Sequence, residues 1–296
     1  MPTFRSTSTR SSKPRATSGS RTRRRAQPDD KENTVTFTGR TQPVSRHGIV
    51  GSLHALKKLG FDGAEICAET KEWGVLDFTP ELVDEIAATL AELDFSAVSF
   101  SRHADYIYDD EAFENTIRLL RLTPRFGTDL FIISGCRRRE SGANIGSVEW
   151  KRMVDRTRTL VREAEEHGVL LAMEHEPDFI VGTTEEQIAL KDELGSANFV
   201  ANLDLGHSFV CDPDIYAAIR TLGPMIRHCH IENMPPGIHK HLLPDDPEGG
   251  MDLPRILREL LEVGFTGPLA LDLYVDDYEA VAEDALRYLR SIDPEQ

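Results

Sequence analysis

The sequence predicts one (β/α)8 barrel, a TIM barrel, on three observations. From residue 34 onward, eight short apolar segments alternate with eight amphipathic segments. The apolar segments are nearly continuous, which is typical of parallel strands covered on both faces. The length of 296 residues suits a single barrel of this kind. An open, doubly wound sheet is the structural alternative, but no Gly-x-Gly-x-x-Gly motif follows the first expected strand.

Each expected element has the pattern of its class. The expected strands are Val35–Gly39, Gly63–Cys67, Ser96–Ser101, Asp129–Ser134, Val169–Glu174, Phe199–Asp204, Ile226–Ile231 and Leu269–Leu273. Between them, apolar residues recur three or four positions apart, as in amphipathic helices. These expected helices are Gly48–Leu59, Pro80–Leu93, Asp110–Phe126, Val148–His167, Thr184–Leu194, Asp214–Leu222, Leu253–Val263 and Tyr278–Leu289. Because parallel strands need crossover connections, this alternation predicts a ring of strands surrounded by helices.

Two helix-to-strand junctions have almost the same sequence. Leu-Gly-Phe-Asp-Gly at 59–63 precedes the second expected strand, and Val-Gly-Phe-Thr-Gly at 263–267 precedes the eighth. Gly60 and Gly264 suit the left-handed position that commonly follows a helix. The repetition favours a cyclic array of similar strand and helix units.

The first 33 residues differ in composition from the rest of the chain. They hold nine Lys or Arg and three acidic residues, with much Ser and Thr and little apolar material. We expect 1–33 to be a disordered basic tail and 34–296 to form the barrel domain. Three interpretations of the tail stay open: an inert extension or misassigned start, a targeting segment, and a contact for an anionic partner.

The expected barrel domain is strongly acidic. It carries 25 basic and 47 acidic residues, a net charge of −22, which counts against nucleic acid as a partner. No apolar run reaches the ~18 residues of a membrane span, so no membrane association is expected. Four cysteines without Cys-x-x-Cys spacing, and a start without an apolar secretion signal, favour a reducing, cytoplasmic location. The sequence is compatible with a homo-oligomer and does not fix the subunit number.

Four consecutive expected strands place a possible metal ligand at or near their carboxyl ends. These ligands are Glu174, Asp204, His230 and Asp272, in chain order. In a parallel barrel such ends meet at one rim, which is the face that carries active sites. Buried carboxylates repel one another unless a cation lies between them, so the pattern predicts one divalent ion bound by all four residues. Oxygen-rich ligation with one imidazole favours Mn²⁺, with Zn²⁺, Co²⁺ and Mg²⁺ as alternatives.

A second polar group is expected beside the first. His207 follows the sixth strand, and His239 and His241 lie in the loop after the seventh. We expect these histidines either to contact the hydroxyl groups of a substrate or to bind a second metal ion. His103, after the third strand, is a candidate for either role.

Loops at the same rim supply further candidate substrate contacts. Arg137 is the first of three adjacent arginines after the fourth strand, which suit a substrate phosphate or carboxylate; a solvated charge run is the alternative. Trp73, Tyr106 and Tyr108 follow the second and third strands and are candidates for stacking on a sugar, or for local packing.

The motifs at the strand ends resemble those of the xylose isomerase-like barrels. They are Met-Glu-His-Glu-Pro at 173–177, Leu-Asp-Leu-Gly-His at 203–207, His-Cys-His-Ile-Glu-Asn at 228–233, His-Lys-His at 239–241 followed by Glu-Gly-Gly-Met-Asp at 248–252, and Leu-Asp-Leu-Tyr at 271–274. The resemblance covers about residues 35–290 and is strongest from 168 to 274. This superfamily includes sugar phosphate isomerases and epimerases, inosose and dehydroshikimate dehydratases and, more distantly, endonuclease IV.

The resemblance implies a metal-dependent enzyme that acts on a small carbohydrate. Glu174, Asp204, His230 and Asp272 would bind the ion, and Glu174 and Asp272 would exchange protons with a carbon next to a carbonyl, through a metal-stabilised enediolate. His207 would hold substrate oxygen, and Glu176 is a further candidate contact. Asp272 stands where ketose epimerases have Glu.

Two other activities of the superfamily are alternatives. A dehydratase of the inosose or dehydroshikimate type would use the same rim. A phosphodiesterase like endonuclease IV is a weaker alternative, although in that enzyme the positions of His207, His239 and His241 bind a further zinc. The strand-four histidine of that family is absent, since Ile133-Ser134-Gly135 occupies its place.

Overall fold

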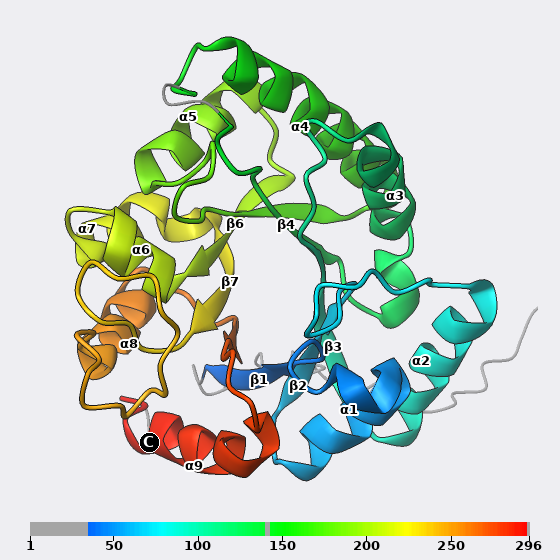
Figure 1. Ribbon diagram of the computed structural model, residues 1–296, viewed down its shortest axis with the longest axis vertical. Helices are drawn as coiled ribbons and strands as arrows, with labels where there is room; N and C mark the ends of the chain where they lie inside the picture. Colours follow the sequence, from blue (N-terminus) through cyan, green and yellow to red (C-terminus); the bar gives the residue numbers. More distant parts are fainter. Residues whose placement is uncertain (1–34, 140–142, 295–296) are drawn as a thin grey trace, which may run out of the picture. The chain divides into compact units, whose positions relative to one another are not determined.

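The computed structural model describes residues 35–139 and 143–294. The expected basic tail, and with it the expected domain boundary after residue 33, lies outside the described residues. Eight parallel strands form a closed barrel in which each strand pairs with its neighbours in chain order and β8 pairs with β1. Figure 1 shows this ring of strands with the helices around it. The predicted (β/α)8 barrel is therefore confirmed.

The strands and helices alternate along the chain. The strands are β1 Thr36–Arg40, β2 Gly63–Cys67, β3 Ser96–Arg102, β4 Leu130–Ser134, β5 Leu170–Glu174, β6 Phe199–Asp204, β7 Ile226–Ile231 and β8 Pro268–Leu271. The α-helices are α1 Gly48–Lys58, α2 Pro80–Glu92, α3 Asp110–Leu120, α4 Val148–His167, α5 Thr184–Leu194, α6 Leu205–Cys211, α7 Ile215–Leu222, α8 Leu253–Glu262 and α9 Tyr278–Ser291. Short 3₁₀ helices occupy Ser45–His47, Thr123–Phe126 and Gly223–Met225.

Two sequence-based expectations were wrong in detail. The expected helix Asp110–Phe126 ends as α3 at Leu120 and is followed by a separate 3₁₀ turn that contains Pro124. Proline has no backbone N–H and clashes with the preceding turn, so it does not continue an α-helix. The second error is α6, which directly follows β6 and was not expected because its seven residues are too few to show a helical period.

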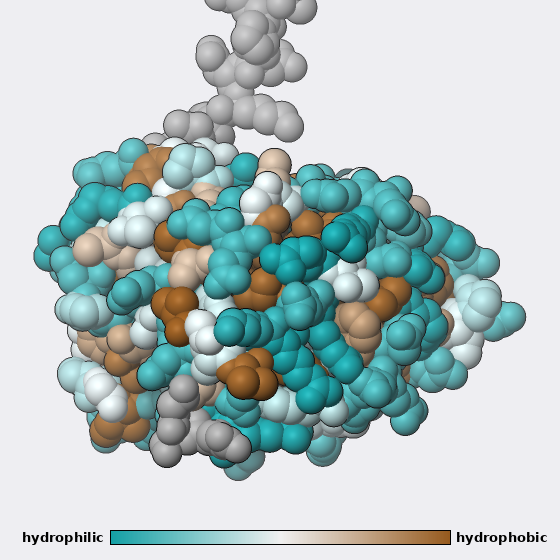
Figure 2. Space-filling view, turned by 90° about the horizontal axis from the view of Figure 1, so that it is seen from above, coloured by the Kyte–Doolittle hydropathy of each residue, from teal (hydrophilic) through white to brown (hydrophobic). Residues whose placement is uncertain are grey.

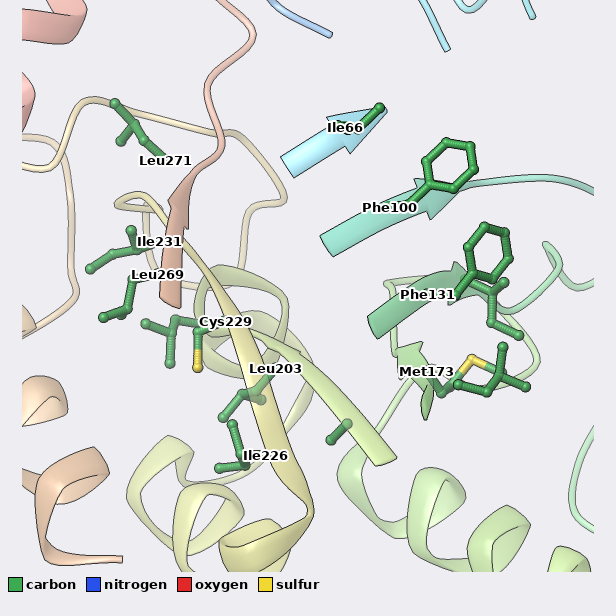
Figure 3. Packing of buried hydrophobic residues seen from close by; sticks show 14 of the residues in the cluster. Ile66, Phe100, Phe131, Met173, Leu203, Ile226, Cys229, Ile231, Leu269 and Leu271 are labelled. Atoms are coloured by element: carbon green, nitrogen blue, oxygen red, sulfur yellow. The ribbon is translucent and has the colours of Figure 1, made fainter. Parts of the chain in front are cut away.

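Buried apolar side chains form two separate clusters. The large one includes Phe100, Phe131, Met173 and Leu203, which Figure 3 shows beside the strands of the barrel. The small one consists of Leu130, Ile132, Ala172 and Val200, with Leu170 packed against it. Because successive side chains of a strand point to opposite faces, the two sets occupy alternate positions. The small cluster lies inside the barrel on β4, β5 and β6, and the large one joins the strands to the helices.

The barrel interior becomes polar toward the carboxyl ends of the strands. On β5, Leu170 and Ala172 belong to the small cluster, whereas Glu174, the next residue on the same face, is acidic. Glu174 pairs in register with Asn202 of β6, and Asp204 pairs with His230 of β7. Parallel pairing therefore collects buried polar side chains at the carboxyl-terminal rim, and the small apolar cluster lies nearer the amino-terminal ends of the strands.

The two similar junctions have the same geometry. Gly60 and Gly264 adopt φ angles of +89° and +82°, which confirms the expected left-handed positions after α1 and α8. Gly63 and Gly267 lie close to neighbouring strands: an added Cβ would lie 3.0 Å from the carbonyl oxygen of Ser96 and 2.8 Å from that of Arg227, respectively. Each junction thus needs one glycine for its backbone angle and one for close approach.

The molecular surface is mostly hydrophilic on the face shown in Figure 2, where hydrophobic residues are scattered rather than gathered. Within 35–139 and 143–294, no helix is both long and apolar enough to cross a bilayer. All four cysteines of the chain are described, and all are free thiols.

Gly267→Ala should lower the free energy of unfolding by about 1–3 kcal/mol, because the new methyl group meets a backbone oxygen that cannot move independently of β7. Urea denaturation measures the change. Thr266→Ala, at the exposed neighbouring position, is the control and should stay within about 0.5 kcal/mol of the parent protein. Equal effects at the two positions would contradict the close-approach argument.

Candidate metal centre and substrate cavity

A cavity of about 900 Å³ opens at the carboxyl ends of the strands. Its wall includes Glu174, Asp272, His207, His239 and His241. Three further candidates, His103, Glu176 and Arg137, also line it. Residues expected from sequence to share one rim are therefore collected around one space, whereas Asp204 and His230 lie behind its wall and are fully buried.

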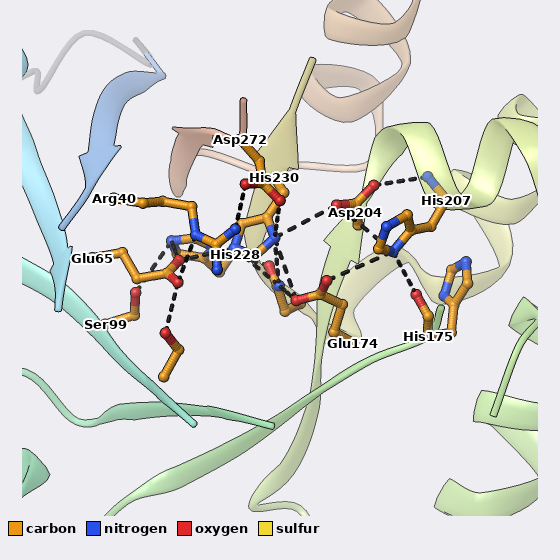
Figure 4. A network of polar contacts seen from close by, with 12 residues as sticks. Arg40, Glu65, Ser99, Glu174, His175, Asp204, His207, His228, His230 and Asp272 are labelled. Atoms are coloured by element: carbon orange, nitrogen blue, oxygen red, sulfur yellow. Dashed lines mark hydrogen bonds and ion pairs between the residues drawn. The ribbon is translucent and has the colours of Figure 1, made fainter. Parts of the chain in front are cut away.

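Three of the four expected metal ligands converge. Ligand atoms of Glu174, Asp204 and His230 all lie within 4.8 Å of one another. Nδ1 of His230 is 3.3 Å from Oε2 of Glu174 and 3.5 Å from Oδ2 of Asp204 (Figure 4). Oδ2 of Asp204 is buried without a hydrogen-bond partner in the structure. Two carboxylates and one imidazole that converge in this way fit a divalent cation, which would also give Oδ2 of Asp204 a partner.

Asp272, the fourth expected ligand, lies at the edge of this group. Its Oδ2 is 3.8 Å from Nδ1 of His230, and its Oδ1 forms an ion pair with Nη1 of Arg40. Asp272 follows the last residue of β8 and was expected within the strand. The structure thus brings three of the ligands close together and gives the fourth a buried arginine as partner.

The orientation of the His230 ring is fixed by Glu65 of β2. Oε2 of Glu65 lies 2.8 Å from Nε2 of His230, which leaves Nδ1 facing Glu174 and Asp204. Glu65 in turn accepts hydrogen bonds from Nε of Arg40 at 3.0 Å and from the hydroxyl of Ser101 at 2.7 Å. Burial alone would raise the pKa of Glu65, but Arg40 and His230 hold it well below its usual range. Glu65 is therefore an ionised carboxylate behind the histidine.

A second buried chain of hydrogen bonds positions Glu174. Nδ2 of Asn202 donates to Oε2 of Glu174 at 2.7 Å, and Oδ1 of Asn202 accepts from Nδ1 of His228 at 2.8 Å. Nε2 of His228 lies 3.3 Å from the hydroxyl of Ser99. Burial lowers the pKa of His228 to about 3, so its ring is neutral at pH 7. The amide orientation of Asn202 follows, because its oxygen faces a donor and its nitrogen an acceptor.

The short helix α6 explains the Asp-x-x-His motif. The carboxylate of Asp204 caps the helix by accepting a hydrogen bond from the backbone N–H of His207 at 2.7 Å. Nδ1 of His207 lies 3.0 Å from the carbonyl oxygen of His175. A carbonyl only accepts, so Nδ1 carries the hydrogen and Nε2 of the neutral ring keeps a lone pair. Burial lowers the pKa of His207 to about 4, so the ring is neutral at pH 7.

The other two histidines of the second group lie against His207. Nε2 of His239 is 3.1 Å from Nε2 of His207, and ligand atoms of the two rings and of His241 all lie within 4.8 Å of one another. Nδ1 of His241 lies 3.1 Å from the carbonyl oxygen of Asp272, so it too presents Nε2 as a lone pair when neutral. The expected second cluster is therefore present as a geometric group.

Two more carboxyl groups adjoin the centre. Glu232 is fully buried, and burial together with the charges of Asp204 and Asp272 raises its pKa well above the usual range. Glu176 is half-buried in the cavity wall. Burial, together with the charges of Glu174 and Asp204, raises the pKa of Glu176 to about 8. In the metal-free protein both groups are therefore largely protonated at neutral pH.

The arginine and aromatic candidates separate into cavity residues and packing residues. Arg137 stacks over the Phe179 ring and lines the cavity. The neighbouring arginines are paired elsewhere: Arg138 with Glu186, and Arg139 with Asp105. Among the aromatic residues, Trp73 lines the cavity. Tyr106 is fully buried and bonds Thr157, and Tyr108 bonds Glu149.

Sequence reasoning missed five polar residues of this centre: Arg40, Glu65, Asn202, His228 and Glu232. The period of two along a strand would have found two of them, because Asn202 and His228 stand two residues before Asp204 and His230. Glu65 is a lone charge inside an apolar strand, which signals a buried partner. No local pattern indicates that Arg40 meets Asp272, since these residues are 232 positions apart and adjacent only because the barrel closes.

The family model of the xylose isomerase-like TIM barrel matches residues 53–292. The chain belongs to this family. A D-psicose 3-epimerase from Enterocloster bolteae is 29% identical over 127 residues, which span 42% of this chain and 40% of that relative.

Solved structures of similar proteins share the fold over most of the chain. An L-ribulose 3-epimerase superposes with a TM-score of 0.72 at 18% identity, covering 88% of this chain and 95% of that one. A probable 3-dehydroshikimate dehydratase from Bacillus anthracis superposes with a TM-score of 0.69 at 16% identity, covering 86% and 99%. At these identities the likeness establishes the family fold and leaves the activity to the site.

Glu65→Gln should weaken the binding of Mn²⁺ by about 10- to 100-fold, because the amide holds the His230 ring less firmly and makes it less basic. Isothermal titration of the metal-free protein measures the affinity. Glu69→Gln is a matched control, since Glu69 is an equally buried carboxylate that pairs with Arg102 outside the centre. Equal losses in the two variants would show that Glu65 has no specific effect on the site.

Proposed function

We propose that this protein is a divalent-metal-dependent isomerase or epimerase of a carbohydrate, which moves a proton at a carbon next to a carbonyl. The observation that carries the proposal is the convergence of Glu174, Asp204 and His230 at the wall of a cavity of about 900 Å³. Family membership and the similarity to a sugar 3-epimerase support the same class of reaction.

Glu174, Asp204 and His230 would hold the cation, with Asp272 as the fourth ligand. The oxygen-rich donor set suits Mn²⁺ first, with Mg²⁺, Co²⁺ and Zn²⁺ as alternatives. When bound, a divalent ion supplies a Lewis acid that makes the C–H bond beside a carbonyl more acidic and offsets the charge of the enediolate.

Glu174 and Asp272 are the proposed proton-transfer groups. Asn202 donates to one oxygen of Glu174 and so fixes the carboxylate in the cavity wall. Arg40 pairs with one oxygen of Asp272 and leaves the other for the substrate side. If Glu174 takes a proton from one face of the carbon and Asp272 returns one to the other face, the outcome is epimerisation. If one carboxylate returns the proton to the neighbouring carbon, the outcome is isomerisation.

Dehydration is the second candidate reaction, and a specific feature favours it. Glu176 lines the cavity and is largely protonated at neutral pH in the metal-free protein, as a group that donates a proton to a departing hydroxyl must be. The structurally similar dehydratase uses the same fold. Loss of water after proton removal would distinguish this outcome, because the product is then 18 mass units lighter than the substrate.

Glu174→Gln should abolish turnover while part of the metal binding remains, because the amide still offers an oxygen but takes no proton. Incorporation of solvent deuterium into a panel of ketoses, inososes and keto acids, followed by mass spectrometry, measures proton removal before any product is identified. Glu163→Gln is the control and should exchange normally, because Glu163 of α4 pairs with Arg121 and does not line the cavity. An unimpaired Glu174→Gln protein would refute the assigned role.

His207, His239 and His241 are proposed to contact substrate hydroxyl groups or to hold a second cation. Nδ1 of His207 and Nδ1 of His241 each face a backbone carbonyl oxygen, so Nε2 is the ring atom of each that is left for either role. Metal analysis of the Mn²⁺- and Zn²⁺-loaded protein decides between them. Two ions per chain, reduced to one in His239→Ala, would establish a second cation site. One ion in both proteins, with KM raised in the variant, would establish substrate contact. Unchanged stoichiometry and unchanged KM would exclude both.

A further inference from the structure

The connection between β7 and α8 carries two of the three clustered histidines. It runs from residue 232 to residue 252, and this stretch, all of which the structure describes, contains no helix or strand. Connections of this kind rarely exceed roughly 12–15 residues. We call residues 232–252 the histidine loop. Because ordering so long a segment costs conformational entropy, specific contacts have to fix the positions of His239 and His241.

The histidine loop closes on Asn233, shortly after the end of β7. The backbone N–H of Asn233 donates to the carbonyl oxygen of Leu242 at 3.1 Å, and its carbonyl oxygen accepts from the N–H of Leu242 at 2.8 Å. This isolated antiparallel pair makes the chain between the two residues return on itself. His241 directly precedes Leu242, so the pair also sets the place of this histidine.

The side-chain amide of Asn233 ties the same point to further parts of the loop. Nδ2 donates to the carbonyl oxygen of Pro244 at 3.1 Å. Oδ1 accepts from the backbone N–H groups of Met234 at 3.0 Å and Met251 at 3.1 Å. Asn233 is only 5% exposed, so these bonds are shielded from water. An amide supplies both the donor and the acceptor that this arrangement needs, whereas a carboxylate only accepts.

Two glycines leave the space that this closure needs. A Cβ added at Gly249 would lie 2.2 Å from Cγ and 2.3 Å from Nδ2 of Asn233. A Cβ added at Gly250 would lie 2.7 Å from Cγ of Pro236. Neither glycine has a positive φ angle, so the requirement is for space rather than for backbone freedom. The Glu-Gly-Gly-Met-Asp motif at 248–252 thus belongs to the closure of the histidine loop.

The closed loop brings its histidines to the cavity. Nε2 of His239 lies 3.1 Å from Nε2 of His207. Nδ1 of His241 lies 3.1 Å from the carbonyl oxygen of Asp272. His239 is exposed to solvent, so packing does little to hold its ring, and the position of the ring depends on the backbone that carries it. Asn233 does not itself line the cavity and can act only through that backbone.

We propose, on the basis of the function proposed above, that Asn233 is a positioning residue whose amide holds the histidine loop so that His239 and His241 face the cavity. Five hydrogen bonds join Asn233 to backbone atoms of the loop. Asn233 therefore determines whether the two rings are in place to contact a substrate or to hold a second cation.

Hydrogen–deuterium exchange of the full chain, followed by mass spectrometry, tests whether Asn233 holds the loop. In Asn233→Ala, the backbone amides of 234–251 should exchange at least about tenfold faster, because three hydrogen bonds are lost, while the barrel strands keep the parent rates. Asn233→Asp keeps the two bonds to Oδ1 and should restore part of the protection. Asn198→Ala is the matched control, since the Asn198 amide also donates to a backbone carbonyl, that of Val169 at 2.8 Å, but just before β6 at the other end of the barrel. Equal acceleration in loop and strands, or none in the loop, would overturn the proposal.

Gly249→Ala reaches the same result by a different route, since it keeps the Asn233 amide and removes its space. The new methyl group should displace the side chain and accelerate exchange of the same amides. Parent-like protection in this variant would also overturn the proposal.

The tautomers of two histidines report whether the rings are in place. Nδ1 of His241 faces the carbonyl oxygen of Asp272. Nδ1 of His207 faces that of His175, outside the histidine loop. Each neutral ring should therefore carry its hydrogen on Nδ1 in the parent protein. In a long-range proton–nitrogen-15 NMR spectrum of Asn233→Ala, His241 should lose its preference for the Nδ1–H form and His207 should keep it. A His241 ring that stays in the Nδ1–H form would refute the positioning role.

A double-mutant cycle connects the position of the rings to function. For a substrate found by deuterium incorporation, Asn233→Ala should reproduce the effect of His239→Ala on KM or on the number of bound ions. The double variant should add little, because both changes act on the same ring. Additive effects would refute the positioning role. If His239→Ala changes neither quantity, the proposed role of the histidines fails, and loop exchange and the His241 tautomer still decide whether Asn233 holds the rings.

Discussion

The burial of several carboxylates inside one barrel mouth is the constraint on which the rest of the structure depends. Glu65, Glu174, Asp204 and Asp272 are at most 3% exposed, and their mutual repulsion must be offset. In the described chain, Arg40 pairs with Glu65 and Asp272, and His230 lies between Glu65, Glu174 and Asp204. Each acid thus meets a fixed cation, an imidazole, or the place where a metal ion fits.

The same constraint explains why the barrel interior is divided into two layers. Leu130, Ile132, Ala172 and Val200 form an apolar cluster inside the barrel on β4, β5 and β6, nearer the amino-terminal ends of these strands than Glu174 and Asp204. On β5 the next inward-facing residue after Ala172 is the acidic Glu174. Parallel register places the polar Asn202 of β6 at the same height. Stability and chemistry are therefore carried by different positions of the same strands, which is how this fold accommodates reactive groups without losing its core.

The fold could be predicted from sequence because its signals are local and repeated: apolar runs, helical periods and the paired glycine junctions at Gly60 and Gly264. The candidate metal ligands at the strand ends were predicted from the same regularity, and the structure brings Glu174, Asp204 and His230 together. Arg40 and Glu65 could not be assigned in this way, because their partners are Asp272, just after β8, and His230 of β7, which barrel closure and strand stagger bring to them. The helix α6 was missed because its seven residues are too few to show a helical period, although the cap that Asp204 forms on it determines where His207 lies.

Protons and a cation compete for the same place in this centre. Burial would lower the pKa of His230, but Glu174 and Glu65 raise it well above its usual range, so the metal-free ring is an imidazolium among carboxylates. The imidazolium supplies the positive charge that the acids require. A ligand nitrogen must be free of its proton, so Nδ1 has to release its hydrogen before it can bind a metal ion. Glu65 and Arg40 keep the other side of the ring unchanged during that exchange. The hydrogen bond between Glu65 and Nε2 of His230 therefore keeps the ring in one orientation, so that Nδ1 faces Glu174 and Asp204 whether it carries a proton or binds a cation.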